Sequence, residues 1–332
     1  MLELTTHKVL VGISGDEDAG AALEYAAEEA RRRGCGVHLV SIVHPVATSS
    51  EAASFNILEG MLHGAGASAL DRAQRHLRDE LGDEVAVTTE LVHGAVVPTL
   101  VSLSDLSAVV VLQHQTSQGI RIPTLSTTSG VAARSHVPVV SVPPVWTTPP
   151  TTDGDVPPVL VGLSDPIAGV GVVRAALEEA RARRAPLEVL HTWHFSDQYD
   201  DLVFEGEAGN RHQAQLLVDV EAGLAPLLEE FADVDTQVRA QHAHVADALA
   251  AASGRAQLLV VGRHRSRMPL GRHLGSTTRA VLHEARCPVM VVNPVVDPVV
   301  DPVVDPVVDP VVVPVSGHSV RRPVLQTGGP AR

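Results

Sequence analysis

The sequence predicts an α/β protein made of two tandem, doubly wound domains, each with a five-stranded, parallel-type sheet and helices on both faces. Two observations support this fold class. Short runs of valine and leucine alternate with segments rich in alanine, glutamate and arginine, as in strands that are buried on both faces and joined by helices. In addition, the second half of the chain repeats the first.

The repeat is carried by four pairs of segments at a separation of 150 residues: KVLVGIS (8–14) and PVLVGLS (158–164), EEARRRGCGVHLVSIVH (28–44) and EEARARRAPLEVLHTWH (178–194), SAVVVLQH (107–114) and QLLVVGRH (257–264), HVPVVSVP (136–143) and RCPVMVVN (286–293). One duplication, essentially ungapped, explains all four matches. It implies that the two copies share one fold.

The alternation of apolar runs and helical segments gives the elements of the first copy in order. We expect strands near 8–13, 37–43, 85–91, 108–112 and 138–142. Helices are expected near 18–33, 59–80, 95–104 and 127–135. The second copy should repeat these elements at the same separation.

Composition shifts divide the chain into four parts. We expect one domain at residues 1–145, a linker at 146–157 that contains TTPPTTDGDVP, and a second domain at 158–294. The last part, residues 295–332, begins with repeats of PVVD, whose regular prolines remove hydrogen-bond donors. We expect an extended or disordered tail there, which serves as a spacer or as a docking segment for a partner.

The charge of the chain limits its partners. With 25 Lys and Arg against 39 Asp and Glu, the net charge of −14 leaves no basic surface for nucleic acid or for an anionic membrane. No stretch of about 20 apolar residues and no signal-peptide pattern is present. We therefore expect a cytoplasmic protein without nucleic-acid or membrane partners.

A glycine-containing motif follows the fourth strand of the second copy. Gly262 ends the strand, Arg265 stands three positions later, and after nine more residues Gly275, Ser276 and Thr277 open a helix. Glycine lets the backbone approach phosphate oxygens closely, and the amides at a helix amino terminus favour negative charge. The motif therefore suits a phosphate group.

This spacing resembles the signature G-x2-G-x9-G-[ST] of the universal stress protein family. VLVGLSD (159–165), ARCPVMVV (285–292) and the order of strands and helices are also similar to that family, over about residues 7–294. The resemblance implies a fold of the adenine nucleotide alpha hydrolase type and ATP, with Mg²⁺, as a ligand of the second copy. It assigns to this ligand Leu163, Ser164, Asp165, Leu190, Gly262, Arg263, Arg265, Gly275, Ser276 and Thr277.

Two departures from the family pattern affect this site. Arg265 replaces the second glycine; it either meets a phosphate with its guanidinium group or is a solvated loop residue. ATP-binding members carry an aspartate just after the first strand, where this chain has Ser14 in one copy and Ser164 in the other. Whether the neighbouring Asp165 compensates is an open question at this point.

The first copy departs further. Leu112, Gln115 and Leu125 stand where the signature has glycines, and only Ser126 and Thr127 are retained. We therefore interpret the first copy as a degenerate partner, which pairs through its final strand with the final strand of the second copy. The result is an intramolecular pseudodimer, with a homodimer of whole chains also open.

The chain offers little for catalysis or metal binding. No nucleophile elbow, Walker loop, carboxylate pair or Cys/His dyad is recognisable, so we expect no catalytic residues and no enzyme. The two cysteines are too few for a disulfide framework. No third ligand stands at a useful spacing from either histidine pair, His191 with His194 or His242 with His244.

Three functions are compatible with these features. The first is a stress-response regulator or sensor that binds ATP through its second copy and acts on an unknown protein partner. The second is a scaffold without nucleotide, which Ser14, Ser164 and Arg265 favour. The third is a weak ATPase or autokinase, ranked last because no general base is identifiable.

Overall fold

The computed structural model describes residues 7–15, 19–44, 52–114, 126–149, 156–165, 167–193, 207–263 and 274–293. Residues Met1–Val295 form one compact unit that holds both copies. The predicted tail and the middle of the predicted linker lie outside the described residues.

The first copy contains β1 (Lys8–Gly12), α1 (Gly20–Arg33), β2 (Val37–Val43), α2 (Ala52–Leu81), η1 (Gly82–Glu84), β3 (Val87–His93), α3 (Val96–Ser104), β4 (Ser107–Gln113), α4 (Thr127–Ala132) and β5 (Val139–Val142). The second contains β6 (Val159–Leu163), α5 (Val170–Arg183), β7 (Leu187–Trp193), α7 (Glu207–Glu230), β8 (Thr236–His242), α8 (Val245–Ser253), β9 (Leu258–Gly262), α9 (Ser276–Glu284) and β10 (Val289–Val292). All predicted strands and helices are present. The largest difference in bounds is the start of α2, which lies at Ala52 rather than near residue 59.

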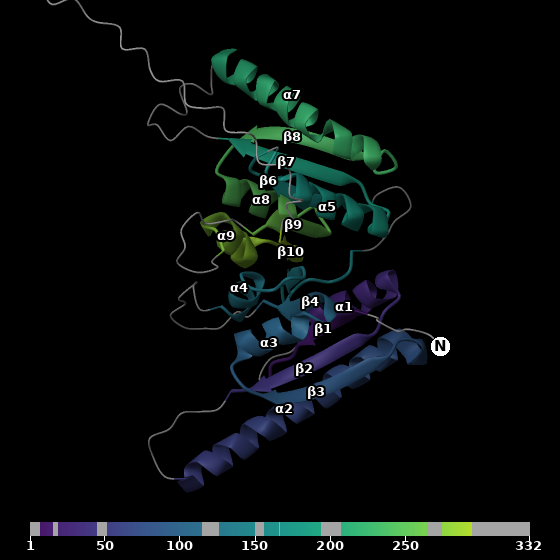
Figure 1. Cartoon of the computed structure of the whole chain (residues 1–332), viewed down its shortest axis with the longest axis vertical. Coiled ribbons are helices and arrows are strands. Elements are labelled where there is room, and N and C mark those ends of the chain that lie inside the picture. The colour runs from purple at the N-terminus through teal and green to yellow at the C-terminus, as the bar shows by residue number, and fades with distance from the viewer. Residues whose placement is uncertain are drawn as a thin grey trace, which may run out of the picture. The chain divides into compact units, whose positions relative to one another are not determined.

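The strands form one ten-stranded sheet in the order β3-β2-β1-β4-β5-β10-β9-β6-β7-β8 (Figure 1). Within each copy all neighbouring strands are parallel. Between the copies, β5 and β10 are antiparallel, with Val140 opposite Met290. The predicted fold class and the predicted pairing of the final strands are both confirmed.

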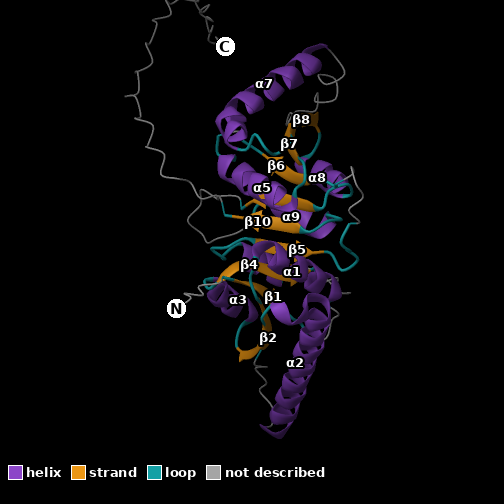
Figure 2. Cartoon of the chain, turned by 90° about the vertical axis from the view of Figure 1, so that its right-hand side faces the viewer, coloured by secondary structure: helices purple, strands orange, loops and turns teal. Residues whose placement is uncertain are grey.

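Helices cover both faces of the sheet (Figure 2). Alternate strand residues point to opposite faces, so Val9 and Val11 join the apolar layer under α1, α2, α5 and α7. Leu10 joins the layer under α3, α4, α8 and α9. Both layers contain residues of both copies, so the core is continuous across the boundary between them.

The repeat is not ungapped, which corrects the sequence interpretation. Val142 pairs with Gln113, and its equivalent Val292 pairs with Gly262. The position of Gly262 is therefore held in the first copy by Gln113, and not by Leu112 as the sequence matches suggested. Runs of valine and leucine match almost equally well after a shift of one residue, so sequence similarity alone cannot set the register here.

The same shift of one residue begins earlier, in the third strand of each copy. Val37 pairs with Val87, whereas its equivalent Leu187 pairs with Thr236. The separation between equivalent residues is thus one residue shorter from β3 to β4 than in β1, β2 and β5. Segments between the strands absorb the difference.

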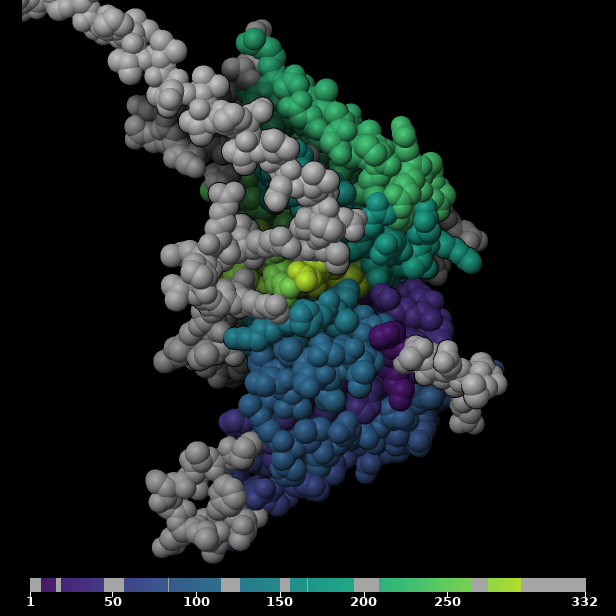
Figure 3. Space-filling model, in the orientation of Figure 1, coloured from purple at the N-terminus to yellow at the C-terminus, as the bar shows by residue number. Residues whose placement is uncertain are grey.

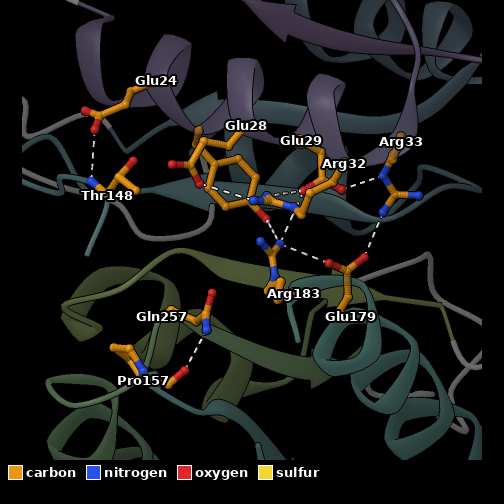
Figure 4. Close-up of polar contacts among 11 residues, drawn as sticks. Glu24, Glu28, Glu29, Arg32, Arg33, Thr148, Pro157, Glu179, Arg183 and Gln257 are labelled. Atoms are coloured by element: carbon orange, nitrogen blue, oxygen red, sulfur yellow. Dashed lines mark hydrogen bonds and ion pairs between the residues drawn. The ribbon is translucent and has the colours of Figure 1, made fainter. Parts of the chain in front are cut away.

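A cluster of buried charges joins α1 to α5 across the boundary between the copies (Figure 4). Arg33 Nη2 donates to Glu179 Oε1 at 2.7 Å, and Arg183 Nη2 lies 3.2 Å from Glu29 Oε2. Within its own helix, each arginine also binds the glutamate four residues before it. Because Glu29 and Arg33 correspond to Glu179 and Arg183, the cluster has approximate two-fold symmetry. The atoms of the two copies meet along this boundary (Figure 3).

The Glu29 carboxyl is only 1% exposed. Burial opposes its ionisation, but three arginine guanidinium groups, Arg183 foremost, lower its pKa to about 2 from 4.5. Its contribution to stability is therefore present above pH 4.5 and is lost as the pH falls from 4.5 toward 2. The ion cluster should hold the copies together at neutral pH.

We expect Glu29→Gln to lower the free energy of unfolding by about 3 kcal/mol at pH 7, because it removes one of the two carboxylates that pair with the buried Arg183 and weakens the pairs of Arg32 and Arg33. The difference from the wild type should shrink between pH 4.5 and 2. Urea unfolding at a series of pH values measures both. The control is Glu80→Gln, in an exposed pair with Arg31, which should cost less than about 0.5 kcal/mol. Equal effects of the two substitutions would contradict the role given to the cluster.

Candidate functional site

In open α/β sheets, ligands bind beyond the carboxyl ends of the strands, where the strand order reverses. In each copy this point lies between the first strand and the fourth, β1 and β4 or β6 and β9. In the second copy the segments that meet there are Ser164–Asp165 after β6, Gly262–Arg263 at the end of β9, and Gly275–Thr277 at the start of α9. The structure thus brings the described parts of the predicted motif to one edge of the sheet.

The start of α9 is open to an acceptor. Gly275 is the N-cap residue, in extended backbone conformation, and no side chain of the described residues caps the helix. Ser276 is exposed and Thr277 is half-buried. Thr278 Oγ1 donates to the carbonyl of Gly262 at 3.2 Å and so ties the first turn of α9 to the end of β9. First-turn amides without a side-chain cap are suitable donors to a phosphate.

Gly262 has a packing role as well as a predicted ligand role. A Cβ atom at this position would lie 2.8 Å from Cγ2 of Val172, in the first turn of α5. In the first copy, Gln113 holds the same position, and its Oε1 accepts a hydrogen bond from the amide of Ala22 at 3.3 Å. The smaller Ala22 stands where the second copy has Val172. The side chain that caps α1 is therefore absent from the equivalent place beside α5.

The predicted site residues in and after β6 and β7 differ in their exposure to solvent. Leu163 and Leu190 are each 2% exposed, so their side chains belong to the core. The carbonyl oxygen of Leu163 lies 3.0 Å from Nδ1 of the buried His191, which therefore acts as the donor. This histidine therefore has a local structural partner.

Ser164 and Asp165 are exposed. Asp165 Oδ1 accepts hydrogen bonds from the amides of Ile167, at 2.8 Å, and Ala168, at 2.7 Å. One carboxylate oxygen therefore stabilises the turn that leads to α5. The structure gives Asp165 a structural role, and its role toward a nucleotide stays a prediction.

Arg263 is directed toward the other copy. Its Nη1 donates to the carbonyls of Ala133, at 2.8 Å, and Ser135, at 3.1 Å, just after the end of α4. A cation is favourable near the carboxyl end of a helix because the last carbonyls carry partial negative charge. These contacts do not support the prediction that Arg263 binds phosphate. Arg265 and the rest of its loop, residues 264–273, lie outside the described residues.

The first copy contains a cavity that the sequence analysis missed. It has a volume of about 300 Å³ and lies at the carboxyl ends of β1 and β4. Its walls include residues after β1, at the end of β4 and at the start of α4: Gly12, Ser14, Gly15, Leu112, Gln113, Ser126 and Thr127. None of its described lining residues is charged. Because the first copy lacks the glycine signature, no ligand site was predicted there. Gly12, Ser14 and Gly15 nevertheless indicate a loop of small residues.

The part of the chain that the structure describes does not support a metal site or a nucleophilic cysteine. There, no group of three or more His, Cys, Asp or Glu side chains could hold a metal ion. Burial raises the pKa of the Cys287 thiol to about 12, so the thiolate needed for nucleophilic chemistry is scarce at neutral pH. None of the described helices has the length and apolar character that a membrane span requires.

Comparison with known proteins identifies a family model twice along the chain. The model of the universal stress protein family matches residues 5–143 and 156–293. A universal stress protein of Mycobacterium tuberculosis is 29% identical over 307 residues, which cover 85% of this chain and 94% of the relative. One of Mycolicibacterium smegmatis is 28% identical over 302 residues, or 87% and 98% of the two chains.

Solved structures agree on the fold. A universal stress protein from Archaeoglobus fulgidus matches with a TM-score of 0.61 at 15% identity, over 87% of this chain and 96% of that one. Two universal stress protein structures in complex with cAMP and with dAMP match with TM-scores of 0.34 and 0.31. At these scores the similarity says nothing about the ligand of this chain.

The packing role of Gly262 leads to a testable prediction. Gly262→Ala should lower the free energy of unfolding by about 1–3 kcal/mol, because the new methyl group would overlap Val172. In a Val172→Ala background the same change should cost at least about 1 kcal/mol less. Urea unfolding of the four proteins measures this coupling. Gly254→Ala is the control, since a Cβ there meets its nearest atom at 3.5 Å. Strictly additive effects would show that packing does not explain Gly262.

Proposed function

Because the chain belongs to the universal stress protein family, we propose that it is a stress-response regulator or sensor that binds ATP through its second copy. The observation that carries this proposal is the start of α9. No side chain of the described residues caps the first turn of α9, and Thr278 holds this turn beside Gly262 at the carboxyl end of β9. A phosphate group placed there would meet free amides, the Ser276 hydroxyl and the positive end of the helix dipole.

The donor set suits a polyphosphate with its metal ion. ATP brings Mg²⁺ on its own phosphate oxygens, and Mg²⁺ is usually held by such oxygens and few protein groups. The hydroxyls of Ser276 and Thr277 are the described side chains that would face the phosphates. Ser164 supplies no carboxylate to the nucleotide, so we expect weaker binding than in a protein with aspartate at this position.

We further propose that binding, and not turnover, is the activity of the chain in the cytoplasm. No arrangement of a base and a nucleophile is found among the described residues of this edge. Arg263 directly precedes the predicted phosphate loop in the sequence and binds carbonyls after the end of α4 in the first copy. Nucleotide at the second copy would therefore act on the contact between the copies, and through it on a protein partner.

A second candidate function rests on the cavity of the first copy. Its uncharged lining, with Leu112 among the wall residues, suits a small neutral ligand and does not suit a polyphosphate. Gln113 already accepts the hydrogen bond of Ala22 at the start of α1. The first copy would then hold a ligand of its own, in a protein whose second site has the phosphate chemistry. A scaffold that binds neither ligand is the remaining alternative.

Two matched substitutions test which copy binds ATP. Thr277→Glu places a negative charge in the first turn of α9, and Thr127→Glu does the same in α4. An acidic residue in the first turn of a helix is compatible with folding because it interacts favourably with the dipole. In calorimetric titration with ATP and Mg²⁺, we expect Thr277→Glu to weaken binding at least about ten-fold and Thr127→Glu to leave it unchanged.

The same titration separates the alternatives. Loss of binding in Thr127→Glu alone would move the site to the first copy. Absence of heat and of thermal stabilisation in the wild type at millimolar ATP would eliminate nucleotide binding and leave the scaffold. Release of ADP on prolonged incubation would contradict a role without turnover.

A further inference from the structure

A second cavity lies between the two copies, on the side of α1 and α5. Its volume is about 350 Å³. Its walls come from the second half of α1, the end of α5, and linker residues that include Trp146, Thr148 and Val156. It shares no lining residue with the cavity of the first copy or with the predicted phosphate site of the second.

Three arginines and one glutamate are among the described residues that line this cavity. Among its lining residues, Arg32 pairs with Glu28 and Glu29, and Arg183 pairs with Glu29 and Glu179. Arg184 also lines the cavity, but its guanidinium forms no ion pair with any described residue. Arg184 is exposed, so its guanidinium is accessible to an anion that enters the cavity.

Two buried polar atoms of the lining have no hydrogen-bond partner among the described residues. They are Oγ1 of Thr148 and Nε of Arg183. Nearly all buried polar groups in proteins are hydrogen-bonded, so orphan groups indicate a missing ligand or water. Figure 4 shows Arg183 directed from the second copy toward the first, at the contact that Thr148 and Gln257 also border.

The backbone of Arg184 also requires an explanation. Its φ of 52° lies in the left-handed region, and no other non-glycine residue in the described part of the chain has a positive φ. The equivalent residue in the first copy is Gly34, with φ 61°. Glycine adopts this conformation without strain, whereas arginine does not. Arg184 is the C-cap residue of α5, where a left-handed backbone is common and glycine is the usual residue.

The cavity also has an apolar wall. The ring of Trp146 packs edge-on against Tyr25, with 5.6 Å between ring centroids. Trp146 is 8% exposed, and the part of it that is exposed borders the cavity. Val156 and Pro157 of the linker continue the wall. The lining therefore combines arginine and hydroxyl donors with aromatic and aliphatic surface, as in pockets for small organic ligands.

We propose that this cavity binds a small organic acid. Its carboxylate or phosphate group interacts with Arg184, Arg183 and Thr148, and its apolar part packs against Trp146 and the linker. Such a ligand contacts α1, α5 and the described linker residues, and thus stabilises the contact between the two copies. The inference does not depend on nucleotide binding at the second copy.

Trp146 provides a local reporter, since the chain has only two tryptophans. The test uses the full chain with Trp193→Phe, and phenyl phosphate as probe. We expect a saturable change in Trp146 emission. Inorganic phosphate has only the anionic group of the probe and benzyl alcohol only its aromatic ring, so each should have a weaker effect. Arg184→Gly should weaken phenyl phosphate at least ten-fold. The same substitution should raise the urea midpoint of unfolding, because glycine relieves the strained backbone.

Loss of binding together with a gain in stability cannot be attributed to misfolding. Arg181→Gln is the matched control on the same helix, where Arg181 pairs with Asp233, and should leave the affinity unchanged. Thr277→Glu should also leave it unchanged, which separates this site from the proposed nucleotide site. No saturable emission change at millimolar phenyl phosphate, or equal affinity in Arg184→Gly, would overturn the proposal.

Discussion

The antiparallel pairing of β5 with β10 is the constraint on which the arrangement of both copies depends. All residues of the two strands are buried. In a single copy, β5 would be an apolar edge with unpaired backbone groups, which is unfavourable in water. The pairing removes this edge and turns two five-stranded sheets into one. Because the pairing is antiparallel, the carboxyl ends of the strands in the two copies lie at opposite edges of the sheet, and their ligand sites cannot merge.

Contacts at this boundary repeat across the two copies with different chemistry. His114 and Arg263 hold equivalent positions, since their amides bind the carbonyls of Val142 and Val292. Both side chains contact the last helix region of the opposite copy. The ring of His114 packs against that of His283 on α9, with 5.1 Å between centroids, while Arg263 binds carbonyls beyond α4. The residue that follows the fourth strand is therefore a contact between copies in both halves of the chain.

Much of the fold was predictable, and the site was less so. Near-continuous valine and leucine runs and alanine-rich helices identified the strands and α-helices of the described residues, because burial on both faces leaves a strong pattern. Register was not predictable, since a shift of one residue changes a valine run very little. Hence Leu112 was matched to Gly262 in place of Gln113. The direction of Arg263 was also beyond prediction, because its partners are backbone carbonyls of the other copy, which have no sequence signal. The cavity of the first copy was not predicted for another reason: a cavity depends on three-dimensional packing, which no sequence motif marks.

Comparison of the two copies distinguishes positions where the residue is the same in both from positions where it differs. Glu29 and Arg33 have the same identities as Glu179 and Arg183 because each contacts its counterparts across the boundary. A change in one would leave a buried charge without a partner, which costs several kcal/mol. Gln113 and Gly262 instead meet the first helix of their own copy, at Ala22 and at Val172. The side chain of Gln113 binds an amide in the first turn of α1, whereas Gly262 has no side chain to bind the start of α5. The contact between the copies requires residues of both copies, so these residues stay alike. Each ligand site is built mainly within one copy, so the two sites can differ.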